Sequence, residues 1–116
     1  IHYGGGSPSQ LSASTLKELN QHLLSLMPTI DKPEIAIECH PGFLDREGWE
    51  AIADAGFNRV SIGIQDTDAD VLKAVNRQQS ILPISEIFEI LRSRGIIINL
   101  DFFFHISLSL LYCIIE

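Results

Sequence analysis

The chain has 116 residues, of which 46% are hydrophobic and 20% charged, and this composition is typical of one globular domain and excludes a disordered chain. The net charge is −7, with 15 Asp and Glu residues against 8 Lys and Arg, and the basic residues form no stripe. This distribution argues against binding to nucleic acid or to an anionic membrane, because both select clustered Lys and Arg.

The cysteines and the start of the sequence bear on metal sites and on the cellular compartment. Cys39 and Cys113 lie far apart, and neither belongs to a CxxC pair or to a Cys/His spacing that would hold zinc or an iron–sulfur cluster. The chain begins inside an apparent strand, without Met or a basic leader, so we expect no signal peptide and an upstream part outside this sequence. The acidic, cysteine-poor composition fits a reducing cytoplasm.

The first predicted element is the end of a buried strand, which runs through Tyr3 into three consecutive glycines, Ser7 and Pro8. Glycine has no Cβ, so the backbone of residues 4–6 can approach a ligand closely and can adopt positive φ. A glycine cluster alone usually marks only a turn, and the rest of the chain has to decide between the two interpretations.

A helix follows, with Ser12 or Ser14 as its N-cap and Pro28 as its stop. Leucines recur along it at helical spacing, which predicts one apolar stripe formed by Leu16, Leu19, Leu23 and Leu26.

The second strand spans residues 33–38, has its isoleucines on one face, and ends at Glu38 in another loop. The next helix is predicted to begin after Asp45, a good N-cap, and to end near Gly56, where a left-handed C-cap is expected. Its inward face is formed by Trp49, Ile52 and Ala53.

The third strand spans residues 57–64 and carries only the small residues Ser61 and Gly63 on one face. Its other face is apolar and consists of Val60, Ile62 and Ile64. Nothing on either face prevents coverage by helices, as a parallel sheet requires.

Gln65 follows the third strand at once, and a helix is predicted over residues 68–75, ending before Arg77. Another helix opens at Pro83. Its inward face is formed by Ile84, Ile87, Ile90 and Leu91. The fourth strand then spans residues 96–101.

Strand and helix alternate, with successive strands roughly 25–40 residues apart, and this spacing predicts an α/β fold with parallel strands and right-handed crossovers. Residues 102–116 break the pattern, because they form an apolar run without a turn signal. The run is too short to span a bilayer, which needs about 20 predominantly apolar residues. We therefore divide the chain into an α/β domain over residues 1–101 and an atypical, unassigned tail.

Glycines or polar side chains follow the carboxyl end of every predicted strand. The glycine loop follows the first strand and Glu38 ends the second. Gln65 follows the third strand, with Arg77 one helix later, and Asp101 ends the fourth. Because the loops of parallel strands converge at that edge of a sheet, we expect these residues to form one site.

The chemistry of this set fits a zwitterionic ligand that carries a ribose. Backbone groups freed at Gly5 and Gly6 can bind an amino-acid moiety, Glu38 can accept from an ammonium or a hydroxyl, and Arg77 can bind a carboxylate bidentately. A polyphosphate is disfavoured, since no GK[ST] follows the glycines.

Each residue also has a structural interpretation by itself. Arg77 could form a surface ion pair, Asp101 could cap a turn, and Gln65 could bond to neighbouring backbone. Cys39 and His40 are more often packing or loop residues than ligands. A shared site remains the preferred interpretation, because purely structural roles would not gather all these residues at one edge.

Four stretches of the sequence resemble a known family. They are Ile-His-Tyr-Gly-Gly-Gly-Ser-Pro-Ser, Ile-Glu-Cys-His-Pro-Gly, Gly-Phe-Asn-Arg-Val-Ser-Ile-Gly-Ile-Gln-Asp and Val-Asn-Arg-Gln-Gln. Over residues 1–101 the chain resembles the oxygen-independent coproporphyrinogen III oxidases of the radical S-adenosylmethionine (SAM) superfamily. The third stretch is specific to this family and its close relatives, whereas the glycine run is shared with the wider superfamily.

This resemblance implies a partial (β/α)6 barrel, of which the chain would hold about four parallel strands. The residues that it assigns to SAM are Gly5, Gly6 and Ser7 at the methionyl end, with Glu38, Gln65, Arg77 and Asp101 around the same cofactor. Such enzymes hold a [4Fe–4S] cluster on a CxxxCxxC loop and take an electron from a donor to cleave SAM. The resulting 5′-deoxyadenosyl radical removes hydrogen from a propionate of the porphyrinogen, which then loses carbon dioxide.

The sequence departs from the family pattern in two places. It has no cysteine loop, whose expected place is upstream of Ile1, and Phe-Phe-His-Ile-Ser replaces the usual Tyr-Gly-Leu-Pro-like loop after Asp101. Later barrel strands are also missing, so we expect this chain alone to bind no cluster and to be inactive. Two alternatives stay open: a haem chaperone of the same superfamily, and an α/β domain that binds a nucleotide or sugar without radical chemistry.

Overall fold

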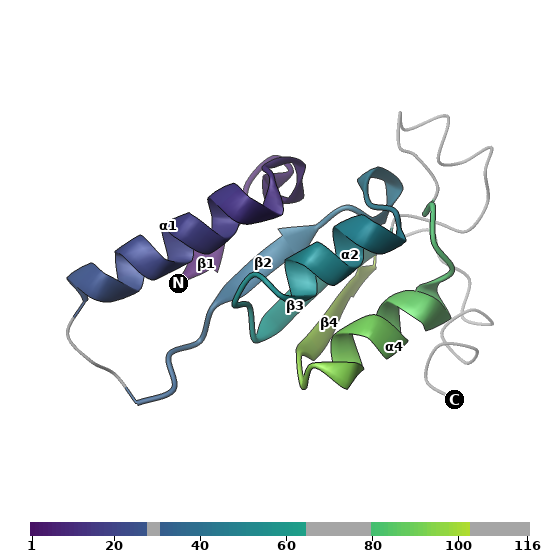
Figure 1. Ribbon diagram of the computed structural model, residues 1–116. Helices are drawn as coiled ribbons and strands as arrows, with labels where there is room; N and C mark the ends of the chain where they lie inside the picture. Colours follow the sequence, from purple (N-terminus) through teal and green to yellow (C-terminus); the bar gives the residue numbers. More distant parts are fainter. Residues whose placement is uncertain (28–30, 65–79, 103–116) are drawn as a thin grey trace.

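A computed structural model describes residues 1–27, 31–64 and 80–102. They form a four-stranded sheet in the order β1-β2-β3-β4, in which all neighbouring strands are parallel (Figure 1). The strands are β1 (His2–Tyr3), β2 (Ala36–Cys39), β3 (Arg59–Ile64) and β4 (Ile97–Phe102), and the α-helices are α1 (Ala13–Leu26), α2 (Arg46–Ala53) and α4 (Ile84–Ser93). Short 3-10 helices, η1 (Pro8–Gln10) and η2 (Pro41–Phe43), follow the first two strands. The predicted α/β fold with parallel strands is confirmed.

The two faces of the sheet differ in cover and in chemistry. Successive side chains of a strand point to opposite faces, and the register aligns Ile37 with Val60 on one face and Glu38 with Ser61 and Asn99 on the other. Helices α1, α2 and α4 all lie on the first of these faces (Figure 1). Within the described part of the chain no helix covers the second, here named the open face, which carries His2, Ala36, Glu38, Arg59, Ser61, Gly63, Ile97, Asn99 and Asp101.

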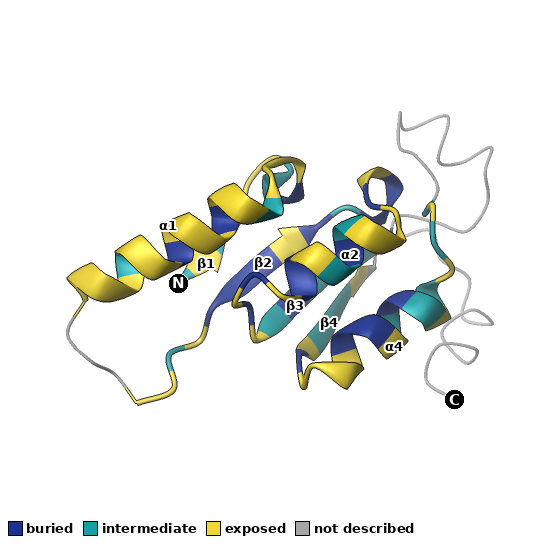
Figure 2. Cartoon of the chain, in the orientation of Figure 1, coloured by how far each residue is buried: buried dark blue, intermediate teal, exposed yellow. Residues whose placement is uncertain are grey.

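The hydrophobic core lies between the covered face and the helices (Figure 2). Its largest fully buried side chains are Trp49, Leu16, Ile37, Ile52, Ile62, Ile87, Leu91 and Val60. The predicted inward face of α2 is confirmed, and so is that of α4 except for Ile84, which is only half-buried. Burying one such side chain stabilises the folded state by about 1.5–3 kcal/mol, so the covered face holds this segment together.

The predicted apolar stripe of α1 is only partly correct. Leu16 is fully buried, but Leu19 and Leu26 are 37% and 69% exposed. Asn20 turns inward instead, and its Nδ2 donates a hydrogen bond of 3.1 Å to the Ala55 carbonyl oxygen. The inner face of α1 thus contacts the backbone carbonyl of Ala55, just after α2. An amide side chain donates a hydrogen bond to this carbonyl, whereas a leucine would leave it unpaired.

The helix starts follow the sequence signals closely. Ser12 rather than Ser14 caps α1, because its Oγ accepts from the Thr15 backbone N–H at 3.2 Å. Asp45 caps α2 by accepting from the Gly48 N–H at 2.8 Å. Gly56 has the expected positive φ of 100°, although α2 itself ends three residues earlier.

The expectation that the first strand is buried is wrong. His2 is exposed and Tyr3 half-buried, because β1 pairs only with β2 and forms one edge of the described sheet. The Tyr3 ring packs edge-on against Phe57, with 5.6 Å between the ring centroids. None of the helices in residues 1–27, 31–64 and 80–102 is both long and apolar enough to cross a membrane.

Candidate functional site

The loop after β1 presents bare backbone at the carboxyl end of the strand. Gly5 and Gly6 have φ of 78° and 62°, in the left-handed region that side chains other than glycine rarely adopt. A Cβ added at either residue would meet no atom within 4 Å. Both glycines are therefore required by backbone conformation, and open space lies above them.

Glu38 of β2 lies against this loop. Its Oε2 accepts a hydrogen bond from the Gly5 N–H at 3.4 Å, and its Oε1 lies 3.1 Å from His2 Nε2. The Glu38 side chain is 47% exposed, so a ligand on the open face can reach the carboxylate. Two parts of the predicted site, separated by 33 residues of sequence, are thus brought together.

Ser7 ends the loop at the N-cap of η1. Its carbonyl oxygen accepts from the Gln10 N–H at 3.0 Å, but its hydroxyl makes no capping hydrogen bond. The half-buried hydroxyl of Ser7 is therefore not committed to holding η1 in place.

Asp101 lies on β4, on the same open face as Glu38. It pairs with Gly63 of β3, one step closer to the carboxyl edge than the row formed by Glu38, Ser61 and Asn99. Two strand spacings, about 10 Å, and two residues along the strand, about 7 Å, separate Asp101 from Glu38, which gives about 12 Å between their Cα atoms. The two carboxylates do not meet each other, but an elongated ligand can contact both. The predicted contacts Gln65 and Arg77 lie outside the described residues, as does the helix predicted between them.

Three open-face residues were missed by the sequence reasoning. His2 contacts Glu38 directly, and Ser61 and Asn99 continue the row of Glu38 across β3 and β4. The sequence signal for them is the alternation of β3, in which buried and partly exposed residues follow each other in turn. Extending that alternation to the neighbouring strands would have placed all three residues on the face of Glu38.

Cys39 and His40 have structural roles, as expected. Cys39 is buried on the covered face, and burial raises the pKa of its thiol to about 12 despite a hydrogen bond with Ser9. Nδ1 of His40 accepts from the Gly42 N–H at 2.9 Å and so shapes η2. The buried Ser9 hydroxyl also accepts from the His40 N–H at 3.4 Å, which ties η1 to the end of β2.

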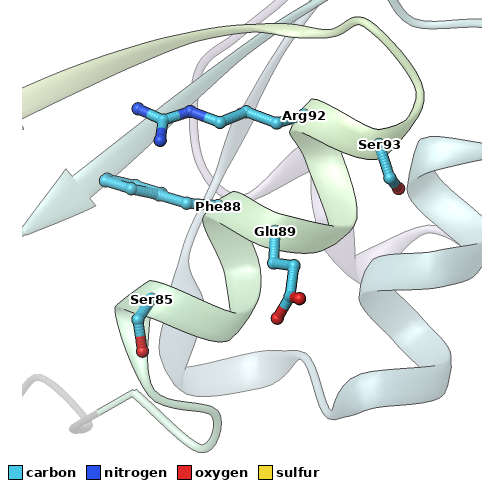
Figure 3. Close-up of a pocket in the computed structure, with 5 residues that line it drawn as sticks. All are labelled: Ser85, Phe88, Glu89, Arg92 and Ser93. Atoms are coloured by element: carbon cyan, nitrogen blue, oxygen red, sulfur yellow. The ribbon is translucent and has the colours of Figure 1, made fainter.

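A separate depression of about 600 Å³ lies on α4. Its lining residues are Ser85, Phe88, Glu89, Arg92 and Ser93 (Figure 3). The Arg92 guanidinium lies above the Phe88 ring, 5.2 Å from its centroid. All five residues belong to one surface helix and none to the open face, so this depression is not part of the site built on β1, β2 and β4.

Comparison with protein families shows which superfamily the chain belongs to. The family model of the radical SAM superfamily matches residues 1–107. The chain belongs to the radical SAM superfamily. Enzymes of this superfamily use SAM and a [4Fe–4S] cluster.

Within the superfamily the chain is similar to oxygen-independent coproporphyrinogen III oxidases. It is 37% identical to the Helicobacter pylori (strain ATCC 700392 / 26695) protein over 103 residues, which are 87% of this chain and 22% of that protein. It is 33% identical to the Paracoccus denitrificans protein over 96 residues, 83% of this chain and 21% of that protein. The chain therefore spans about a fifth of the length of these relatives.

A solved radical SAM structure has the same fold in this region. The coproporphyrinogen III oxidase of Escherichia coli, described as a radical SAM enzyme, superposes with a TM-score of 0.75 at 30% identity. The match covers 87% of this chain and 24% of that one. The prediction of a segment of a radical SAM barrel, with about four parallel strands, is confirmed.

The described residues fit one of the two superfamily cofactors. Open backbone at Gly5 and Gly6, with the half-exposed Glu38 carboxylate beside it, fits the amino-acid end of SAM. The cluster finds no such match here: residues 1–27, 31–64 and 80–102 contain no group of three or more Cys, His, Asp or Glu arranged to hold a metal. Cys39 is not a substitute ligand, because its side chain is buried on the covered face of the sheet, opposite to Glu38.

Proposed function

We propose that this chain forms the SAM-binding part of an oxygen-independent coproporphyrinogen III oxidase. The observation that carries the proposal is the contact between the glycine loop and Glu38, in which the Gly5 N–H donates to the Glu38 carboxylate at 3.4 Å. It places positive-φ backbone and a reachable carboxylate at one end of one face, in a chain similar to these oxidases over most of its length.

The role of each residue follows from its chemistry. The Glu38 carboxylate would accept from the ammonium group of SAM, while the backbone at Gly5 and Gly6 and the hydroxyl of Ser7 would line its methionyl end. Asp101, about 12 Å away on the same face, would accept from hydroxyls at the far end of the same ligand. We assign Gln65 and Arg77 to the same cofactor on the resemblance of their sequence stretches.

The reaction needs partners beyond the described residues. When bound, SAM and a reduced [4Fe–4S] cluster supply the carbon radical that starts oxidative decarboxylation of propionate side chains. The substrate we propose is the porphyrinogen of haem biosynthesis, and an external donor would supply the electron. We further propose that the protein acts in the cytoplasm, without nucleic-acid or membrane partners. This chain contributes binding and orientation of SAM, and residues 1–116 alone are expected to be inactive.

Turnover by the full-length protein tests the proposal. The protein is reconstituted anaerobically with iron and sulfide and incubated with SAM, a reductant and coproporphyrinogen III. We expect a decarboxylated product with vinyl groups, detected by mass spectrometry. SAM binding without any decarboxylated product would contradict the oxidase and favour a haem chaperone, and absence of SAM binding would favour a nucleotide- or sugar-binding domain.

Glu38→Ala tests the site itself. Removing the carboxylate should weaken SAM binding to the reconstituted full-length protein by about tenfold or more, since a hydrogen bond to a charged group contributes about 1.5–3 kcal/mol. Isothermal titration calorimetry measures the change. The control is Glu34→Ala, because Glu34 lies outside the strand and pairs with Arg59, away from the glycine loop. Equal affinities for wild type and Glu38→Ala would remove Glu38 from the site.

A further inference from the structure

His2 lies beside Glu38 on the open face. It pairs with Ala36, two residues before Glu38, and residues two apart on a strand point to the same face. His2 Nε2 lies 3.1 Å from Glu38 Oε1, within hydrogen-bond distance. The contact therefore follows from the register of β1 against β2.

Gly4 leaves the space in which this contact forms. Unlike Gly5 and Gly6, Gly4 does not have positive φ, so backbone conformation does not require a glycine there. A Cβ at Gly4 would lie 2.9 Å from His2 Nε2 and 3.0 Å from Glu38 Oε1, so close that the ends of both side chains would have to shift. The His2–Glu38 pair therefore lies directly over the Gly4 backbone, and the three residues pack as one unit.

The carboxylate of Glu38 is held from two sides. His2 contacts Oε1, while the Gly5 N–H donates to Oε2 at 3.4 Å. Each carboxylate oxygen can accept two hydrogen bonds, so capacity remains for a ligand. The side chains of His2 and Glu38 are 58% and 47% exposed, which leaves a path to that remaining capacity.

We propose that His2 is a positioning residue, which fixes the Glu38 carboxylate in the orientation that binds the ammonium group of SAM. This inference rests on the proposed function and deepens it. An exposed pair of this kind contributes little to the stability of the fold. It can raise the affinity for a ligand, because a side chain that is already held in place loses less conformational freedom on binding. Gly4 supports the same orientation by keeping the space under the pair free.

A matched pair of variants at His2 tests the proposal. His2→Phe keeps a planar ring but removes the nitrogen, whereas His2→Gln places an amide nitrogen the same number of bonds from the backbone. In the reconstituted full-length protein we expect His2→Phe to bind SAM about five- to tenfold more weakly, and His2→Gln to bind within about twofold of wild type. Calorimetry gives the affinities, and the denaturation midpoint of each variant shows whether the fold is intact.

Gly4→Ala gives a second, independent test. Its Cβ should displace the pair and weaken SAM binding alone, but should add little in a protein that already carries His2→Phe, because both changes act through Glu38. Unchanged affinity in His2→Phe, failure of His2→Gln to restore binding, or additive effects of His2→Phe and Gly4→Ala would each overturn the inference while leaving the proposed function standing. Wild-type protein that binds no SAM would overturn the proposed function first.

Discussion

The three glycines of the loop after β1 differ in what a side chain would disturb. A Cβ at Gly4 would displace the side-chain ends of His2 and Glu38, whereas Gly5 and Gly6 are required by φ and have open space above them. The same substitution should therefore act differently at neighbouring positions: crowding at the first, and backbone strain at the other two.

Gly6→Ala tests the strain term. A left-handed φ costs a residue with a Cβ about 1–2 kcal/mol, so the free energy of unfolding should fall by about that amount. Urea denaturation of the full-length protein measures the change. Gly6→Asn is the control and should cost less, since Asn tolerates this conformation better. Equal stability of Gly6→Ala and wild type would show that the loop can abandon positive φ without cost.

The buried Cys39 thiol makes stability depend on pH in the alkaline range. Its pKa rises from 9.0 in the unfolded chain to about 12 in the folded protein, because burial disfavours the thiolate. The unfolded state loses its proton first, so this contribution to stability is complete below about pH 9 and is lost as the pH rises toward 12.

We expect the free energy of unfolding to fall from pH 9 upward by at most about 1.4 kcal/mol per pH unit from this group. Cys39→Ala should reduce that slope. Iodoacetamide labelling with peptide mapping provides a second readout, in which folded Cys39 should react far more slowly than Cys39 in urea. Rapid labelling of the folded protein at pH 8 would contradict the burial.

At the scale of elements, a single side chain caps the N-terminus of α2. Asp45 accepts from the Gly48 N–H at 2.8 Å, and no other side chain caps this helix among the described contacts. Asp45→Ala should lower the free energy of unfolding by about 1 kcal/mol, whereas Asp45→Asn should cost less because an amide oxygen also accepts. Urea denaturation followed by the fluorescence of Trp49, which α2 carries into the core, measures both variants. Equal losses for the two would assign the effect to charge rather than to the cap.

The order, direction and caps of the elements could be predicted from the sequence, because each depends on local signals. The strand alternation of β3 and the cap at Asp45 are examples. The orientation of α1 could not be predicted, because it depends on a carbonyl at Ala55 that only tertiary structure brings to Asn20. Spacing alone favoured Leu19, and packing selected Asn20 instead.

The arrangement of the candidate site residues was predictable to the same extent. Glu38 and the glycine loop end neighbouring parallel strands, so their meeting followed from the strand order. The contact of His2 with Glu38 needed the register of β1, which two residues of strand do not fix in a sequence. Asp101 was correctly placed at the same edge, and its distance from Glu38 came from the position of β4 two strands away.

At the scale of the whole molecule, we expect the described sheet to favour association between copies of the chain. β1 and β4 are the outermost strands of the described sheet, and Ile97 of β4 is 54% exposed on the open face. Unpaired strand edges and exposed apolar residues favour association between copies. In a closed barrel, by contrast, this face would point to the interior.

We therefore expect the 116-residue chain, produced alone, to self-associate at micromolar concentration. Ile97→Lys should reduce the associated fraction, because a charge beside the edge opposes pairing. Sedimentation velocity measures the distribution of species. Ser93→Lys, on the exposed end of α4, adds the same charge away from the edge and should change little. Equal effects of the two would point to net charge rather than to the edge.

Because the residues of β3 alternate between the two faces of the sheet, substitutions in this strand fall into two classes. Substitutions at Val60, Ile62 and Ile64 act on the core, while those at Ser61 and Gly63 act on the open face, which carries the proposed site. The open face can therefore change in sequence without disturbing the core. Insertion or deletion of a single residue in this strand would exchange the two sets, so length here should be more strictly preserved than identity.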